Sequence, residues 1–270
     1  MPPRLLHLVR HAQGHHNVNW QHYIRDPTLT DLGHSQCHRL ATTFPHHDSV
    51  THVICSPLKR TIQTTLECFY PTITRLASEN KDFKIRTDPY FQENGEWECD
   101  LGSFVPEVQD FFSNFAEEQT SGGSAIRGYE HHARLDFSPV EQSAPEWPEK
   151  IGIFAAKNVE KRGGYARNYL FESFTEDDEV VIVSHGGYLH VLTEDWDSYD
   201  EMKGTAWENT ERRSFVVTRN NQGKVVLEET QESIKNRIGH LMGDTDAGTE
   251  RRETEIVGHH TAPPAQTVKT

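Results

Sequence analysis

The stretch LLHLVRHAQGHHN, residues 5–17, leads from a short apolar segment directly into an arginine, a histidine and a polar turn. Its first five residues have the composition of a buried strand. In an open α/β sheet, ligands bind at the carboxyl ends of the strands, where loops gather polar groups over an apolar base. Arg10 and His11 therefore stand where such a sheet would place a binding site.

A second apolar run ends in the same way. Residues 180–183 read VVIV and are followed by Ser184 and His185, after which two glycines open a helical pattern. If both runs are strands of one sheet, the fold itself brings His11 and His185 to the same edge.

The rest of the pattern predicts strands that alternate with helices. Further strands are expected at residues 52–55, 84–86, 213–218 and 224–228, with NNQG joining the last two as a hairpin, and helices at residues 30–43, 58–69 and 149–174. Thr30 or Asp31 can cap the first of these helices. The alternation predicts an α/β fold, a three-layer sandwich with a mainly parallel central sheet and helices on both faces.

Residues 102–148 differ from the rest in being rich in Gly, Ser, Pro and Glu. We interpret them as an insertion that forms a lid, because long loops in compact domains tend to be functional, although a decorative loop fits the same composition. We expect one domain over residues 1–240 that includes this insertion, and a polar, flexible tail over residues 241–270. The insertion carries the aromatic residues Phe104, Phe111, Phe112, Phe115, Tyr129 and Phe137.

The composition excludes several classes of partner. The 270 residues carry 41 acidic and 27 basic side chains, a formal charge of −14, which would repel a long polyanion such as DNA but not a small anion in a local basic pocket. No apolar run approaches the ~18 residues of a membrane span, so we expect a cytoplasmic protein with neither a nucleic-acid nor a membrane partner, and leave its oligomeric state open. Packing roles in a reducing compartment are expected for the widely spaced cysteines, Cys37, Cys55, Cys68 and Cys99.

Arg60 follows the second predicted strand by way of SPLKRTIQT, residues 56–64, and would join Arg10, His11 and His185 at the same edge. Two guanidiniums and two imidazoles repel one another unless an anion lies among them. A phosphoryl group matches best in charge and shape, because arginine presents a planar fork of donors to its oxygens.

A phosphoryl group at two histidines indicates a two-step reaction. A neutral imidazole can attack phosphorus and form a phosphohistidine, which water or a second acceptor then discharges. The leaving alkoxide needs a proton from a carboxylic acid, and residues 90–104, YFQENGEWECDLGSF, offer Glu93, Glu96, Glu98 and Asp100. We choose Glu93, because it lies nearest the end of the third predicted strand.

Each of these residues alone has a structural explanation, since a histidine after a strand is more often a turn residue than a nucleophile. Their joint placement carries the hypothesis. The histidine doublets, His15-His16 among them, raise the idea of a metal site, but the strand ends lack a convergent set of carboxylates, so neither a metal nor another cofactor is expected. Cys99 has no neighbouring base and is expected to pack rather than react.

With these residues identified, the chain resembles the histidine phosphatase superfamily, in its phosphoglycerate-mutase-like branch. VRHAQGHHN resembles the family's Arg-His-Gly signature, and the likeness continues in family order through LTDLGHSQ, SPLKRTIQT, QENGEWECDLG and VSHGG. The likeness covers roughly residues 5–218, and the segment GGYLHVLTEDW looks most like fungal members.

The resemblance implies that His11 is the phosphorylated nucleophile and Glu93 the proton donor. Ala12 replaces the signature glycine and Gln13 stands where many members have Glu, but neither departure touches a catalytic group. The groups that the resemblance places around the phosphoryl oxygens are the side chains of Arg10, Asn17, Arg60 and His185 and the backbone N–H of Gly186.

A phosphatase and a mutase share the phosphoenzyme and differ in whether water or a bound hydroxyl takes the phosphoryl group. Residues 95–149 lack the paired arginines that the resemblance would lead one to expect of a bisphosphoglycerate-dependent mutase; their basic side chains are Arg127, His131, His132 and Arg134. We therefore predict a phosphatase that acts on a small phosphorylated metabolite. A phosphomutase, or a binding or scaffold protein on the same fold, is the alternative.

Overall fold

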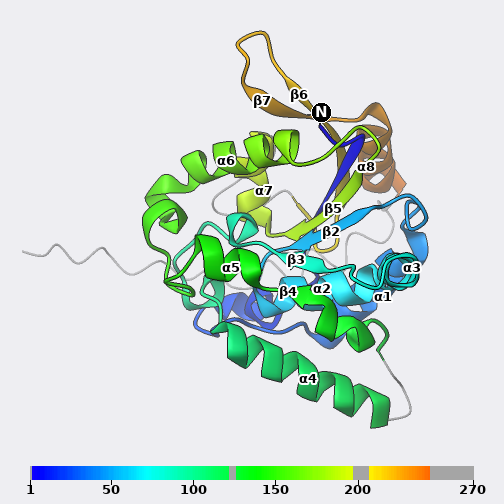
Figure 1. Cartoon of the computed structure of the whole chain (residues 1–270), viewed down its shortest axis with the longest axis vertical. Coiled ribbons are helices and arrows are strands. Elements are labelled where there is room, and N and C mark those ends of the chain that lie inside the picture. Colours follow the sequence, from blue (N-terminus) through cyan, green and yellow to red (C-terminus); the bar gives the residue numbers. More distant parts are fainter. Residues whose placement is uncertain (1, 122–125, 197–206, 244–270) are drawn as a thin grey trace, which may run out of the picture.

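The computed structural model describes residues 2–121, 126–196 and 207–243, and within them the strands form a seven-stranded sheet of order β4-β3-β2-β5-β1-β6-β7 (Figure 1). The strands from β4 to β1 in this order run parallel to one another. Strand β6 pairs antiparallel with β1, and β7 pairs antiparallel with β6. The predicted mainly parallel α/β sheet is therefore confirmed. The strand bounds are β1 (Leu5–Arg10), β2 (His52–Cys55), β3 (Ile85–Thr87), β4 (Leu135–Asp136), β5 (Glu179–Ser184), β6 (Arg212–Arg219) and β7 (Val225–Glu229).

Helices cover both faces of this sheet, as the three-layer prediction requires (Figure 1). The α-helices are α1 (Asp31–Thr43), α2 (Lys59–Cys68), α3 (Tyr70–Glu79), α4 (Val105–Ser121), α5 (Ser138–Ser143), α6 (Val159–Glu172), α7 (Gly186–Thr193) and α8 (Gln231–Gly243). Short 3₁₀ turns are η1 (His15–Trp20), η2 (Pro89–Phe91), η3 (Glu98–Asp100), η4 (Tyr129–Arg134), η5 (Gly152–Phe154) and η6 (Ala156–Asn158).

The alternation of side chains along the strands divides the core into two parts. On β5, Val181 and Val183 pack with α1 to α5, whereas Val180 and Ile182 pack with α6 and α7 on the other face. All four side chains are fully buried. Strand β5 is thus apolar on both faces between its two polar end residues, Glu179 and Ser184.

Local signals account for most of the element boundaries. The hydroxyl of Thr30 accepts a hydrogen bond from the N–H of Gly33 over 3.1 Å and so caps α1, as predicted. The NNQG hairpin is also confirmed, with Gly223 at a φ of +77° that suits glycine. Helix α6 begins later than predicted, because η5 and η6 take up the residues before Val159. The sequence analysis did not identify α3 or α8.

The expected insertion is largely helical rather than a loop. It contributes α4, η4 and α5, and its strand β4 extends the sheet beside β3. Phe112, Tyr129 and Phe137 are buried in the core, so packing explains these aromatic residues. Phe104 is 56% exposed. A lid role for the segment stays a prediction.

The carboxyl-terminal end is described only as far as α8. This helix runs to Gly243, a few residues past the predicted start of the tail, and the rest of the predicted tail lies outside the described residues. Among the residues that the structure describes, no helix combines the length and the apolar composition needed to cross a bilayer.

Candidate active site

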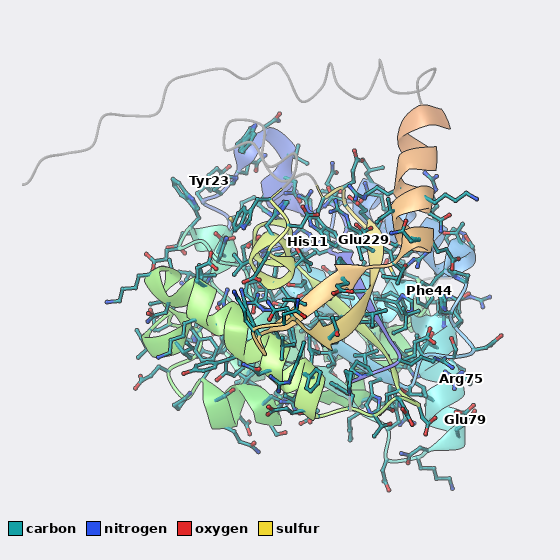
Figure 2. All side chains as sticks on the ribbon, turned by 90° about the horizontal axis from the view of Figure 1, so that it is seen from above. His11, Tyr23, Phe44, Arg75, Glu79 and Glu229 are labelled. Atoms are coloured by element: carbon teal, nitrogen blue, oxygen red, sulfur yellow. The ribbon has the colours of Figure 1, made fainter. Side chains whose placement is uncertain are left out.

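The ends of two adjacent strands bring His11 and His185 together. Strands β1 and β5 pair in parallel with Arg10 opposite Ser184, and the N–H of His11 donates to the carbonyl of Ser184 over 2.9 Å. The two imidazole rings lie 5.2 Å apart between centroids, at an interplanar angle of 62°. Both are buried, His11 at 2% and His185 at 0% exposure (Figure 2 labels His11 among the densely packed side chains). The structure thus places both rings in the same site.

Arg60 joins the two histidines. It lies in the first turn of α2, directly beyond β2, and is 1% exposed. Its Nε donates to Nε2 of His11 over 3.3 Å and its Nη2 to Nδ1 of His185 over 3.0 Å. The remaining nitrogen, Nη1, donates to the carbonyl of Cys99 over 2.7 Å. One guanidinium therefore fixes the relative position of two imidazoles.

These contacts determine which ring nitrogen carries the proton. Nδ1 of His11 lies 2.7 Å from the carbonyl oxygen of Ala12, which can only accept, so Nδ1 carries the hydrogen and Nε2 keeps its lone pair. Nδ1 of His185 accepts from Arg60, so the proton of this ring is on Nε2, which donates to the hydroxyl of Ser56 over 2.8 Å. His11 thus presents a neutral, basic nitrogen.

The charges around the rings favour the same state. Burial, together with the charges of Arg60 and Arg10, holds the pKa of His11 well below its usual range. Burial and the neighbouring Arg60 also hold the pKa of His185 well below its usual range. The sequence alone predicts a cluster whose positive groups repel one another unless an anion lies among them. In the structure, neutral imidazoles accept hydrogen bonds from a guanidinium, which lessens this repulsion.

Glu93 is held at the start of α7, next to His185. Its Oε1 accepts from the backbone N–H of Tyr188 over 2.9 Å and of Asn94 over 2.8 Å, and its Oε2 lies 3.4 Å from the N–H of Gly187. These contacts position the carboxyl group of Glu93, because the first N–H groups of a helix have no partner within the helix.

Two buried cations hold the backbone of Glu93. Nζ of Lys150 donates to the carbonyl of Glu93 over 2.8 Å, and Nη2 of Arg162, on α6, donates to the carbonyl of Gln92 over 2.9 Å. Lys150 is 8% exposed and Arg162 1% exposed. The sequence analysis missed both residues, because neither lies in a motif or directly follows a strand.

The other three acidic residues of this segment have different surroundings. Asp100 is buried at 7% exposure, with Oδ1 3.7 Å from Nη2 of Arg60. Glu96 accepts from the N–H of Ala156, and Glu98 pairs with Arg25 at the surface over 3.5 Å. Asp100 is thus the second carboxylate beside the cluster.

The remaining predicted ligands lie around this cluster, but with their own partners. Arg10 donates from Nη1 to the carbonyl of Trp207. Oδ1 of Asn17 accepts from the N–H of Gly14 over 3.0 Å and closes the η1 turn. Gly186 is the first residue of α7, directly after His185. Arg10 and Gly186 thus adjoin His11 and His185 along the chain, and Asn17 adjoins His16.

His16 was missed as a member of the site. Its ring lies 5.5 Å from that of His11 between centroids, and the residue is 6% exposed. The available signal was the His15-His16 doublet directly before Asn17, which the sequence analysis considered only as a metal ligand.

The four cysteines are buried free thiols, which confirms their expected packing role. Burial raises the pKa of Cys99 to about 12, so its thiol stays protonated at neutral pH. Among the described residues, the group with metal-ligand geometry is His7, His46 and Glu179, whose ligand atoms lie within 4.8 Å of one another. It lies at the starts of β1 and β5, at the opposite edge of the sheet from His11.

Comparisons with known proteins identify the family. The model of the histidine phosphatase superfamily (branch 1) matches residues 6–136. A probable phosphatase of Schizosaccharomyces pombe is 28% identical over 193 residues, which cover 68% of this chain and 74% of that protein. A phosphoglycerate mutase-like protein of Arabidopsis thaliana is 27% identical over 271 residues, with 84% of this chain and 89% of that protein covered. A crystal structure of phosphoglycerate mutase from Bacillus anthracis is similar at a TM-score of 0.46 and 18% identity, over 84% of this chain and 92% of that chain. The chain belongs to branch 1 of the histidine phosphatase superfamily, among its phosphoglycerate-mutase-like members.

Proposed function

We propose that the chain is a phosphomonoester hydrolase that acts on a small phosphorylated metabolite through a phosphohistidine on His11, without a metal ion. One observation carries the proposal: the lone pair on Nε2 of His11 faces the guanidinium of Arg60, which also holds His185. A nucleophile and a set of phosphate donors thus meet at one buried point.

In the first step, the phosphoryl oxygens of the substrate draw the donors of Arg60 away from the imidazoles and onto themselves. Nε2 of His11 then attacks phosphorus while the bond from phosphorus to the ester oxygen breaks. The carbonyl of Ala12 keeps its hydrogen bond to Nδ1 of His11 and so stabilises the positive charge that develops on the ring. Arg10, Asn17 and the N–H of Gly186 supply further donors to the oxygens.

Glu93 handles the proton in both steps. As an acid it protonates the departing ester oxygen, and as a carboxylate it then takes a proton from the water that attacks the phosphohistidine. This role is supported by its contacts with the N–H groups of Gly187 and Tyr188, in the first turn of the helix that directly follows His185. Hydrolysis leaves inorganic phosphate and restores neutral His11.

The contacts of the insertion favour transfer to water over transfer to a second substrate hydroxyl. Arg134 donates to the carbonyls of Lys81 and Phe83, and the guanidinium of Arg127 lies over the ring of Tyr70. His131 likewise contacts Thr74, and His132 contacts the carbonyl of Tyr129. A mutase would need such cations to hold the second anionic group of its substrate. The buried thiols suit the cytoplasmic location, which stays a prediction.

The test is phosphate release from an aryl phosphate by the purified full chain, with and without a chelator, combined with detection of acid-labile phosphoprotein after rapid quenching. We expect turnover that the chelator leaves unchanged, and loss of both turnover and phosphoprotein in His11→Ala. His52→Ala is the matched control, because His52 is half-exposed and pairs with Asp178 at the far end of the strands. Turnover that requires a divalent cation, or persists in His11→Ala, would contradict the proposal, and phosphate transfer to an added alcohol without release would favour a mutase.

A further inference from the structure

The ring of His16 lies beside the proposed nucleophile, 5.5 Å from the His11 ring between centroids. It stems from η1, whereas His185 follows β5, and both rings lie within 5.5 Å of the His11 ring between centroids. His11 is therefore one of three imidazoles that come from three separate segments. The family signature and the strand-end rule account for His11 and His185, but neither accounts for His16.

His16 is buried without a partner for one of its nitrogens. The residue is 6% exposed, and Nδ1 has no hydrogen-bond partner in the part of the chain that the structure describes. A buried polar atom normally has a partner, because leaving it unpaired forfeits its hydrogen bonds to water. The imidazole of His16 therefore has hydrogen-bonding capacity that the described residues do not use.

The position of the ring is fixed by the backbone beside it. A Cβ at Gly14 would lie only 2.8 Å from Nδ1 and 2.9 Å from Cε1 of His16, so only glycine leaves space for the ring. The turn itself is closed by Asn17, whose Oδ1 accepts from the N–H of Gly14. The ring therefore packs closely against the backbone of this turn.

The charges acting on His16 are those of the phosphate site. Burial and the neighbouring Arg60, His11 and Arg10 lower the pKa of its imidazole, and His16 in turn helps to lower the pKa of His185. His16 is therefore neutral in the free protein. A neutral imidazole still carries one N–H, which can donate to a phosphoryl oxygen.

We propose that His16 is a further phosphate-binding residue, whose imidazole N–H donates to a phosphoryl oxygen of the substrate and of the phosphohistidine on His11. The inference rests on the proposed function, because it needs a phosphoryl group at His11. It assigns the His15-His16 doublet a role in binding an anion rather than a metal.

The test measures binding of orthovanadate and inorganic phosphate, together with kcat and KM on an aryl phosphate, in three variants of the full chain. His16→Leu removes the donor at similar size, and His16→Asn keeps an N–H donor. His15→Leu is the matched control, because His15 is the exposed neighbour in the doublet. We expect His16→Leu to lower kcat/KM by about 100-fold and to weaken vanadate binding at least tenfold, as loss of one oxyanion donor commonly does. His16→Asn should retain most of the binding, and His15→Leu all of it.

Unchanged vanadate binding in His16→Leu would overturn the inference. Equal losses in His16→Leu and His16→Asn, with a lowered melting temperature in both, would show a packing role and overturn it as well. Arg60→Met separates this failure from failure of the proposed function. If Arg60→Met abolishes vanadate binding while His16→Leu leaves it intact, only the role of His16 is wrong; if Arg60→Met also binds vanadate normally, the phosphate site itself is wrong.

Discussion

Nε of Arg60 donates a hydrogen bond over 3.3 Å to Nε2 of His11, the nitrogen that the proposed mechanism uses for attack. The guanidinium proposed to bind the phosphoryl oxygens thus also contacts the proposed nucleophile. Burial is the largest cause that lowers the pKa of His11, and the charge of Arg60 is the next largest. Arg60 therefore both contacts the proposed nucleophile and favours its neutral form.

Arg60→Met should change both the rate and its dependence on pH. Removal of a charge-stabilising donor commonly costs about 10²- to 10³-fold in turnover. Because Arg60 lowers the pKa of His11, its removal raises that pKa, and a protonated ring cannot attack. The acidic limb of the kcat/KM profile, which reports the free enzyme, should therefore move to higher pH. Arg60→Lys should rescue poorly, because one ammonium cannot serve two imidazoles with the geometry of a fork.

Arg75→Met is the control for this measurement. Arg75 pairs with Glu79 over 2.8 Å on α3, at the outer edge of the molecule and away from His11 (Figure 2). This variant should keep the wild-type rate and pH profile. An acidic limb that stays in place in Arg60→Met would show that Arg60 does not set the protonation state of His11.

Glu93→Gln should slow alkyl phosphates more than aryl phosphates. An alkoxide is a poor leaving group and depends on a proton from the acid, whereas a phenolate departs with less help. The measurement is kcat/KM over a series of esters with leaving groups of increasing pKa, and the slope of its logarithm against that pKa should become steeper in the variant.

Asp100→Asn is the matched comparison, since Asp100 is the other buried carboxylate beside Arg60. We expect this variant to lower kcat/KM by the same factor for all esters, because Asp100 acts through Arg60 rather than on the leaving group. If the steeper slope is found in Asp100→Asn instead, the two acids have been assigned the wrong way round.

Lys150→Met should act on the same step as Glu93→Gln, but more weakly. Nζ of Lys150 holds the carbonyl of Glu93, so its loss lets the acid shift without removing it. Burial lowers the pKa of Lys150 to about 8, so the ammonium charge is present below that pH and is lost above it. The wild-type protein should therefore lose activity toward alkyl phosphates as the pH rises through about 8. Lys150→Arg should keep its activity toward alkyl phosphates to higher pH, because a guanidinium stays charged. If the pH profiles of Lys150→Arg and the wild type are identical, Lys150 is not the cause of the loss of activity at high pH.

The sheet and the main site residues could be predicted because their signals are local. An apolar run that stops at Arg10-His11 or at His185, and a helix that begins just before Arg60, each place a side chain at a known edge of the sheet. Thr30 and the NNQG turn are likewise read from a few adjacent residues.

The residues that were missed depend on contacts between distant segments. Lysine and arginine usually lie at the surface, so the sequence does not single out Lys150 or Arg162. Both are buried because α6 and residues 149–158 pack against the backbone of Gln92 and Glu93. The insertion was read as a loop because its composition is polar, whereas Phe112 and Tyr129 pack against α2 and α3 and thereby fix its helices. The protonation states of His11 and His185 depend on their burial, which the spacing of residues along the sequence does not reveal.

The opposite edge of the sheet gives a prediction about stability. Glu179 is 2% exposed and accepts hydrogen bonds from Nε2 of His7 and Oγ of Ser49, both over 2.9 Å, and from Arg4. Burial alone would raise the pKa of Glu179, but these hydrogen bonds, that of His7 foremost, lower it from 4.5 to about 2. This carboxylate ties the starts of β1 and β5, the two strands that lead to His11 and His185.

A carboxylate whose pKa is lower in the folded than in the unfolded chain stabilises the fold fully at a pH above its pKa in the unfolded chain. This stabilisation is lost as the pH falls toward its pKa in the folded chain. The urea concentration at the midpoint of unfolding of the wild-type protein should therefore decrease as the pH is lowered from 4.5 to about 2. Glu179→Gln should be less stable at pH 7 by about 3 kcal/mol, because it leaves buried donors poorly paired, and its midpoint should depend less on pH in that range. Glu172→Gln, which removes an exposed carboxylate 3.7 Å from Arg219, should leave both the midpoint and its pH dependence unchanged. Equal pH dependence in the wild type and Glu179→Gln would show that another group controls the acid transition.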